Sequence, residues 1–288
     1  MKLIEIENWT EKNERLSAVF TPDKGMNMIS FKKGSVQVID QKTKPLFEER
    51  AAGLGALIGP HFHHRKPFEI NTCFDERIFP HIQGLRKKKI LEPFSHGIAR
   101  YVPWRYDHSS TQIEAKLSST DLYHNTLISI LEGFEFEMRL IVRMLPTGLY
   151  FRYDITSEKP SCIGFHTYYH LPKEGGSITS EVSGTYRDQS TLKPLKNDWV
   201  QNDQLYFTLP QKADFGFYPM DPIDSNRILY KNRDFSLHLF YECSSCDHSF
   251  QIYHPDGAGF VCIEPLSSKN PQKPERCDNR LELKLEIY

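Results

Sequence analysis

Apolar and polar residues alternate one by one over long stretches of this chain, and this alternation constrains the fold more than any other feature. Successive side chains of a β-strand point to opposite faces of a sheet, so a period of two predicts strands with one buried face. No long segment shows the period of 3.6 residues that is typical of an amphipathic helix. We therefore expect an all-β protein built from two large packed sheets. The alternating apolar residues of the two clearest segments are Phe134, Phe136, Met138, Leu140, Val142, Leu281, Leu283, Leu285 and Ile287.

The chain length and the positions of the glycine and proline clusters predict the domain organisation. Glycine and proline clusters separate the strand-like segments, and the 288 residues contain neither a linker-like composition nor an internal repeat. All-β domains often reach this size, so we predict one domain over residues 1–288. Residues 60–95 and 265–280 lack the alternation and predict long polar loops, where binding and catalytic residues are often found.

The charge balance and the cysteines exclude several function classes. The chain has 36 Lys and Arg against 37 Asp and Glu, which predicts neither a nucleic acid nor an anionic membrane as a partner. No apolar run approaches the roughly 18 residues of a membrane-spanning helix, and the N-terminus shows no secretory pattern. The six cysteines form no dense framework. We expect a reduced, cytoplasmic protein.

Glu264 is the most unusual residue of the predicted strands. It stands in the apolar stretch 257–265, beside Val261 and Ile263. An unpaired carboxylate in such a strand is strongly unfavourable, so it needs a partner, an ion or a raised pKa. Each of these alternatives makes Glu264 a candidate functional residue.

Two further segments carry candidate acid–base or binding residues. In the strand-like segment 164–172, His166 and Tyr168 share one face, and histidine is the commonest acid–base residue near neutral pH. A strand histidine bound to a backbone carbonyl is the alternative. The segment 95–104 joins His96, Arg100 and Trp104, a mixture suited to a polar ligand with an apolar face, or simply a turn with a buried tryptophan.

Two motifs raise the question of a metal. His61 and His63 followed by Glu69 resemble the first motif of the all-β cupins, but Glu69 is too distant and the second motif is missing. Cys243 and Cys246 have the C-x-x-C spacing of a zinc or redox site. A structural zinc needs four ligands, and no second such pair exists. We therefore expect a hairpin turn with free thiols there.

Taken in order, five segments resemble the aldose 1-epimerase (galactose mutarotase) family, near its hexose-6-phosphate epimerase branch. They are the strand-turn segment 21–30, the segment 59–65 that ends in Arg65, His96-Gly-Ile-Ala-Arg100, Gly164-Phe-His166-Thr-Tyr-Tyr, and Phe260-Val-Cys-Ile-Glu264-Pro265. The resemblance implies a β-supersandwich fold and an enzyme that interconverts the α and β anomers of a hexose or hexose phosphate. It implies neither a metal nor an organic cofactor.

The resemblance also implies a role for each matching residue. Glu264 would be the general base at the anomeric hydroxyl, and His166 the general acid at the ring oxygen. Arg65 and His96 would bind sugar hydroxyls or polarise the ring oxygen, and Arg100 belongs to the same pattern. The residue that orients the sugar would be Asp214, with Asp221 as a competitor.

The chain departs from the family at Leu266, where the family has a tryptophan after the catalytic Glu-Pro. This change leaves open a non-catalytic sugar-binding protein on the same fold, and a metal-dependent cupin-like enzyme is the less favoured alternative. The cationic residues available for a phosphate are Arg65, Arg77, Arg86, Arg100 and the lysines at 87–89.

Overall fold

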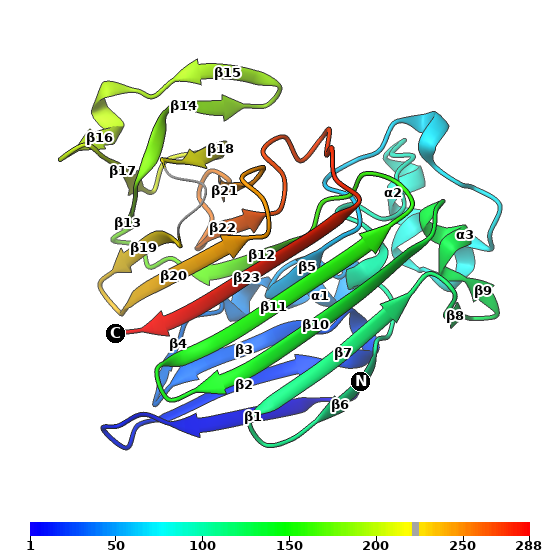
Figure 1. Ribbon diagram of the computed structural model, residues 1–288, viewed down its shortest axis with the longest axis horizontal. Coiled ribbons are helices and arrows are strands. Elements are labelled where there is room, and N and C mark those ends of the chain that lie inside the picture. The colour runs from blue at the N-terminus through cyan, green and yellow to red at the C-terminus, as the bar shows by residue number, and fades with distance from the viewer. Residues whose placement is uncertain (221–224) are drawn as a thin grey trace.

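The computed structural model describes residues 1–220 and 225–288, and within them the protein is almost entirely β. Eleven strands form one antiparallel sheet in the order β1-β2-β3-β5-β12-β22-β21-β18-β14-β15, with β4 paired to β3. Ten strands form a second sheet in the order β16-β17-β13-β19-β20-β23-β11-β10-β7-β6, and β8 and β9 make a small hairpin. The prediction of an all-β protein with two large sheets is confirmed (Figure 1).

The bounds of the elements are as follows. The eleven-stranded sheet contains β1 Ile4–Trp9, β2 Arg15–Thr21, β3 Asn27–Lys33, β4 Val36–Gln37, β5 Gly55–Ile58, β12 Gly164–His170, β14 Val182–Asp188, β15 Thr191–Pro194, β18 Ala213–Pro219, β21 Ser249–His254 and β22 Phe260–Leu266. The ten-stranded sheet contains β6 Arg105–His108, β7 Gln112–Ser118, β10 Phe136–Leu145, β11 Gly148–Ser157, β13 Gly176–Ser180, β16 Val200–Gln201, β17 Gln204–Leu209, β19 Asn226–Asn232, β20 Ser236–Cys243 and β23 Asp278–Ile287. The remaining elements are β8 Leu122–Tyr123, β9 Thr126–Leu127 and the helices α1 Lys44–Arg50, α2 His81–Lys87 and α3 Ile128–Glu132. None of the helices in the described part of the chain is long and apolar enough to cross a membrane.

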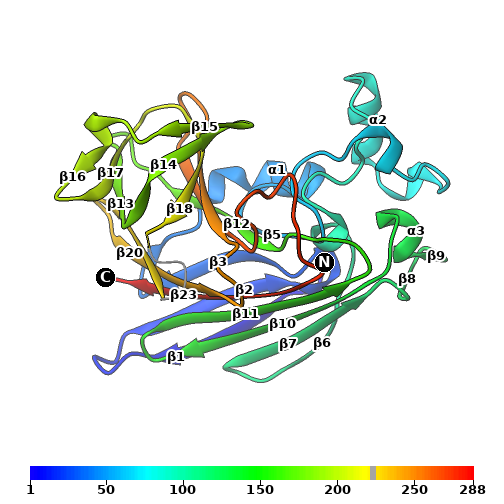
Figure 2. The ribbon, with the colours of Figure 1, turned by 45° about the horizontal axis from the view of Figure 1, so that its top comes forward.

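The core lies between the two sheets, which form separate layers in Figure 2. The alternating segments supply it as predicted, because Leu281, Leu283 and Leu285 of β23 are all buried. From the other layer, Phe165 of β12 packs on Phe151 of β11 with ring centroids 5.1 Å apart. Because neighbouring side chains of a strand point to opposite faces, His166 lies on the outer face of the eleven-stranded sheet, away from this core.

One row of side chains runs across that outer face. Directly paired residues of neighbouring strands have their side chains on the same face of a sheet. The pairs Gly164 with Leu266 and Thr167 with Ile263 bring His166 level with Glu264. The complete row, from β5 to β14, is Ala56, His166, Glu264, Gln251, Gly216 and Arg187.

The predicted long loops cover this row. Residues 60–95 contain only short 3-10 turns and α2, and residues 267–277 connect β22 to β23 without regular structure. In Figure 2, α1 and α2 lie on the side of the eleven-stranded sheet that is remote from β10 and β11. The charged and polar row is therefore buried under a cover of irregular chain.

The C-x-x-C segment corrects one prediction. Cys243 ends β20 in the ten-stranded sheet, and the chain then enters β21 in the eleven-stranded sheet. The segment is therefore a crossing between the two layers and not a hairpin. Both Cys243 and Cys246 are free thiols, as expected.

The predicted strand-turn segment 21–30 contains the turn between β2 and β3, which contacts the segment that carries Arg100. Gly25 has a left-handed φ of 72°, and its N–H donates to the carbonyl of Val102 at 3.0 Å. A Cβ on Gly25 would lie 2.3 Å from backbone atoms of Arg100. This turn therefore supports the segment that carries Arg100 from behind.

We predict that Gly25→Ala lowers the free energy of unfolding by about 2 to 4 kcal/mol, the sum of left-handed strain and overpacking. Gly34→Ala is the matched control, because Gly34 also has a positive φ of 56° but open space around its Cβ position. The control should lose only about 1 kcal/mol. Urea denaturation measures both, and equal losses would show that Gly25 does not buttress Arg100.

Candidate functional site

The row on the outer face and its cover enclose a cavity of about 620 Å³. Four predicted site residues from distant parts of the chain line it together with Glu264: His96, Arg100, His166 and Asp214. A cavity of this size and polarity suits a small polar ligand.

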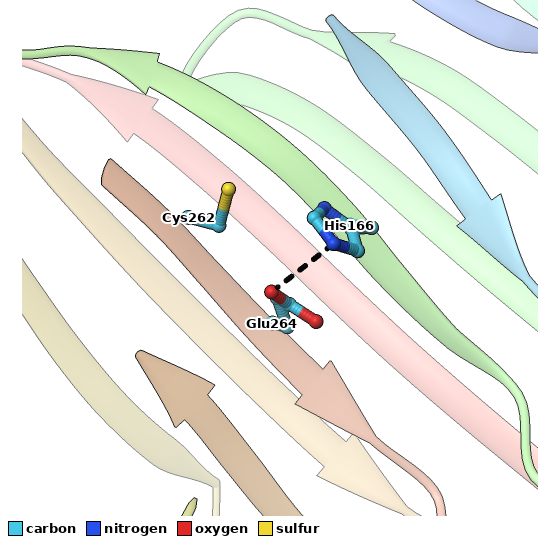
Figure 3. A group of neighbouring side chains, drawn as sticks. All are labelled: His166, Cys262 and Glu264. Carbon is cyan, nitrogen blue, oxygen red and sulfur yellow. Dashed lines mark ion pairs between the residues drawn. The ribbon is translucent and has the colours of Figure 1, made fainter. Parts of the chain in front are cut away.

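His166 and Glu264 form the centre of the cavity. Nε2 of His166 lies 3.4 Å from Oε1 of Glu264, the contact drawn as a dashed line in Figure 3. Both are buried, with 6 % and 2 % of their surfaces exposed. The ring of Tyr168 stacks on His166 with centroids 4.8 Å apart and fixes the plane of the imidazole. Two titratable side chains, an imidazole and a carboxyl group, thus stand side by side on adjacent strands.

Burial determines the protonation of this pair. It lowers the pKa of His166 to about 3, and the charge of Arg100 adds to the effect. Burial and the nearby Asp214 raise the pKa of Glu264 well above its usual value, while Arg100 and Arg187 act in the opposite direction. Burial therefore favours the neutral form of both groups, an imidazole at His166 and a carboxylic acid at Glu264.

His96 is a second histidine of the cavity, on the cover. The backbone N–H of His96 donates to the backbone carbonyl of His63 at 3.2 Å. The ring Nδ1 of His96 accepts from the backbone N–H of His63 at 3.1 Å. Burial, followed by the charge of Arg100, lowers the pKa of His96 well below its usual value, so the ring is neutral and carries its proton on Nε2. His96 is therefore a fixed donor, and its ring lies 5.0 Å from that of His166.

Asp214 lies in the cavity beside two residues that the sequence did not single out. Nε2 of Gln251 donates to Oδ1 of Asp214 at 2.7 Å, and Nη2 of Arg187 donates to Oε1 of Gln251 at 3.1 Å. Only the strand register reveals this chain of contacts, because the three residues are far apart in sequence. The competing candidate, Asp221, lies outside the described residues.

Arg65 is not among the residues that line the cavity. Its guanidinium group donates from Nε to Glu92 at 2.8 Å and also contacts Glu132, in a buried cluster beneath the cover. His61 joins the cluster through Nδ1, 2.6 Å from Glu132. Burial opposes ionisation of Glu92, but Arg65 and His61 still lower its pKa to about 2. The cluster fixes the cover, and Glu92 itself reaches the cavity wall.

The structure brings one group of possible metal ligands together and keeps the group predicted from the sequence apart. Among the described residues, the one group of three or more ligand atoms close enough for an ion is His166, Cys262 and Glu264, whose atoms lie within 4.8 Å of one another (Figure 3). These nitrogen, sulfur and oxygen donors are of the kinds that zinc accepts. The cupin-like set is not brought together, because His61 binds Glu132 while Glu69 accepts from the N–H of Lys66.

Position 266 is a leucine, and the aromatic side chains of the cavity come from other parts of the chain. Leu266 is fully buried in a small cluster with Ile58 and Cys162, against which Phe62 packs. Phe62, Tyr168 and Tyr253 line the cavity. These three rings give the cavity an aromatic surface that does not depend on position 266.

Comparisons with known proteins give a clear result for the fold alone. No family model and no curated protein sequence matches the chain. Among solved structures, a galactose mutarotase-like protein from Lactobacillus casei is similar over 100 % of both chains, with a TM-score of 0.71 and 15 % identity. An aldose epimerase homologue from C. elegans matches over 100 % of this chain and 99 % of its own, with a TM-score of 0.67 and 9 % identity. A galactose mutarotase related enzyme from Lactobacillus acidophilus matches over 100 % and 97 %, with a TM-score of 0.65 and 13 % identity. The expected galactose mutarotase-like fold is confirmed.

The buried cluster predicts a large structural effect at Arg65. Arg65→Met leaves Glu92 and Glu132 buried without their cation, so the free energy of unfolding should fall by about 3 to 5 kcal/mol. Arg77→Met is the control, because Arg77 makes an exposed ion pair with Asp75 and should lose at most about 1 kcal/mol. Denaturant titration of both variants distinguishes them, and a near-neutral Arg65→Met would contradict the structural role.

The lowered pKa of His166 predicts a pH dependence of stability. The unfolded chain binds a proton at His166 below pH 6.5, whereas the folded protein binds it only near pH 3. Stability is therefore fully present above pH 6.5 and is lost as the pH falls toward 3. Between pH 7 and pH 5 the wild type should lose about 2 kcal/mol more than His166→Gln. Urea unfolding at both pH values measures this difference, and parallel losses would mean that His166 titrates normally.

Proposed function

We propose that the protein is an aldose 1-epimerase that interconverts the α and β anomers of a hexose or hexose derivative. The observation that carries the proposal is the buried His166–Glu264 pair, 3.4 Å apart at the centre of the cavity. Anomer exchange needs an acid and a base at two oxygens bonded to the same carbon, so the two groups must stand side by side.

Ring opening uses the pair in its ionised form. The Glu264 carboxylate takes the proton of the anomeric hydroxyl, and the electrons of that O–H bond form the second C1–O1 bond. The C1–O5 bond breaks, and O5 takes the proton of Nε2 of His166. Glu264 is then protonated and His166 neutral, which is the protonation state that burial favours.

Ring closure reverses these transfers. Rotation about the C1–C2 bond presents the other face of the aldehyde to O5. As O5 forms the new bond to C1, its proton returns to His166, and Glu264 protonates O1. Arg100 and Arg187 favour the carboxylate form of Glu264, the form that takes the proton of the anomeric hydroxyl.

The remaining residues bind and orient the sugar. His96 offers the N–H of Nε2, Asp214 accepts from hydroxyl groups, and Phe62 and Tyr253 cover the apolar face of the ring. Arg65 acts through Glu92, holding the cover in position, so its effect on the sugar is indirect.

Glu264→Gln tests the assignment, because an amide cannot take the anomeric proton. NMR saturation transfer between the α and β signals should show exchange with the wild type and at least about 100-fold slower exchange with the variant. Glu114→Gln is the control, since Glu114 is half-buried on the ten-stranded sheet, away from the cavity. Undiminished exchange with Glu264→Gln would reject Glu264 as the base.

A non-catalytic sugar-binding protein is the second candidate. The observation that favours it is the neutral state of His166, whose pKa of about 3 disfavours the protonated acid. Calorimetry showing that hexoses bind to the wild type without any acceleration of anomer exchange would select this function over the first.

A further inference from the structure

Two arginines of the cavity wall are buried and have no ionic partner among residues 1–220 and 225–288. Arg100 and Arg187 expose 3 % and 6 % of their surfaces, and both line the cavity. Nη2 of Arg100 donates to the hydroxyl of Tyr101 at 3.3 Å, and Nη2 of Arg187 donates to Gln251. The Nε atoms of both arginines have no hydrogen-bond partner within the described part of the chain.

The other arginines that were predicted as candidates for binding an anionic ligand already form ion pairs with carboxylates of the protein. Arg65 is paired with Glu92, Arg77 with Asp75, and Arg86 with Glu76. Of the predicted set of arginines, only Arg100 is left facing the cavity without a carboxylate, among the residues that the structure describes. Arg187 joins it from β14, a strand that carried no motif.

The sheet is shaped to receive the Arg187 guanidinium. Arg187 is paired directly with Gly216 of β18, and a Cβ on Gly216 would lie 2.5 Å from Nη2 of Arg187. The glycine therefore leaves the space over which the guanidinium group lies. Gln251 fixes its far side, because the amide oxygen accepts from Arg187 while the amide nitrogen donates to Asp214.

Buried cations of this kind require compensation by an anion. Desolvating a charge is unfavourable unless it is paired, and Gln251 separates Arg187 from Asp214. Burial favours the neutral form of Glu264 and so weakens the compensation that this group gives to the two arginines. Both guanidinium groups line the cavity, where an anionic group of a ligand would compensate their charge.

We propose that the cavity binds a sugar carrying an anionic group, a carboxylate or a phosphate, and that Arg187 holds this group. The inference rests on the proposed function, since it places a sugar beside Glu264. Arg187 is three strands away from Glu264 in the row, about 14 Å at the usual strand spacing, although its side chain leans back to Gln251. Gln251 is paired directly with Glu264, so the anionic group lies on the side of Gln251 that is away from Glu264.

The test compares binding of neutral and charged hexoses by calorimetry. Glucose, glucose 6-phosphate and glucuronate are the probes, so the phosphate and the carboxylate are distinguished from each other. The wild type should bind one of the charged sugars about 10- to 100-fold more tightly than glucose, as expected for a charge-assisted hydrogen-bonded pair.

Two variants test Arg187 independently. Arg187→Gln should remove the preference for the charged sugar and leave glucose binding within about 3-fold of wild type. Gly216→Ala keeps the charge but displaces the guanidinium group, so it should weaken the same preference. Arg77→Gln, which removes an exposed arginine, should change nothing. Equal losses for charged and neutral sugars in Arg187→Gln would overturn the inference, as would equal affinities in the wild type.

These experiments can reject the anionic subsite and the proposed reaction independently of each other. If the charge preference depends on Arg187 but no anomer exchange occurs, the proposed reaction is wrong and the anionic subsite stands. If exchange occurs with equal affinity for neutral and charged hexoses, the reaction stands and the subsite is rejected. Absence of binding by all three sugars would reject this inference.

Discussion

Burial of the outer face of the eleven-stranded sheet is the constraint on which the candidate site depends. Without the cover of residues 60–95, Glu264 and His166 would be ordinary solvated groups on an exposed strand face. Under it, Glu264 is 2 % exposed, the pKa of His166 falls to about 3, and the pKa of Glu264 rises. The same exclusion of water strengthens every charge interaction with a bound ligand. The irregular cover is therefore as important to the chemistry as the strands beneath it.

The cover is held by a second set of buried charges. Arg65, His61, Glu92 and Glu132 form ion pairs under it, and the carboxylate of Glu132 also accepts from the N–H of Ile98, at the beginning of the segment that carries Arg100. A buried ion cluster is costly to break because each partner becomes an uncompensated charge. The geometry of His96 and Arg100 thus depends on a cluster of four residues, of which Glu92 alone reaches the cavity wall.

Sequence patterns predicted the sheets and most of the residues at the centre of the site. Alternation predicted the two sheets because burial of one sheet face requires it, and Glu264 was identified because a charge in an apolar strand is unusual. The segments around His166 and His96 were candidates from their residue types, and the resemblance assigned their roles and added Asp214. The structure brings all three together with Glu264. Arg187 and Gln251 were missed, since their placement depends on the register of four strands whose pairing no local pattern encodes. Arg65 could not be separated from the cavity residues, because its carboxylate partners are 27 and 67 residues away.

A crystal structure of the Glu264→Gln variant grown with the hexose that binds most tightly tests the central claim most directly. The account predicts a sugar in the cavity with O1 within about 2.6 to 3.2 Å of residue 264 and O5 at the same distance from Nε2 of His166. A sugar bound with C1 away from this pair would contradict it.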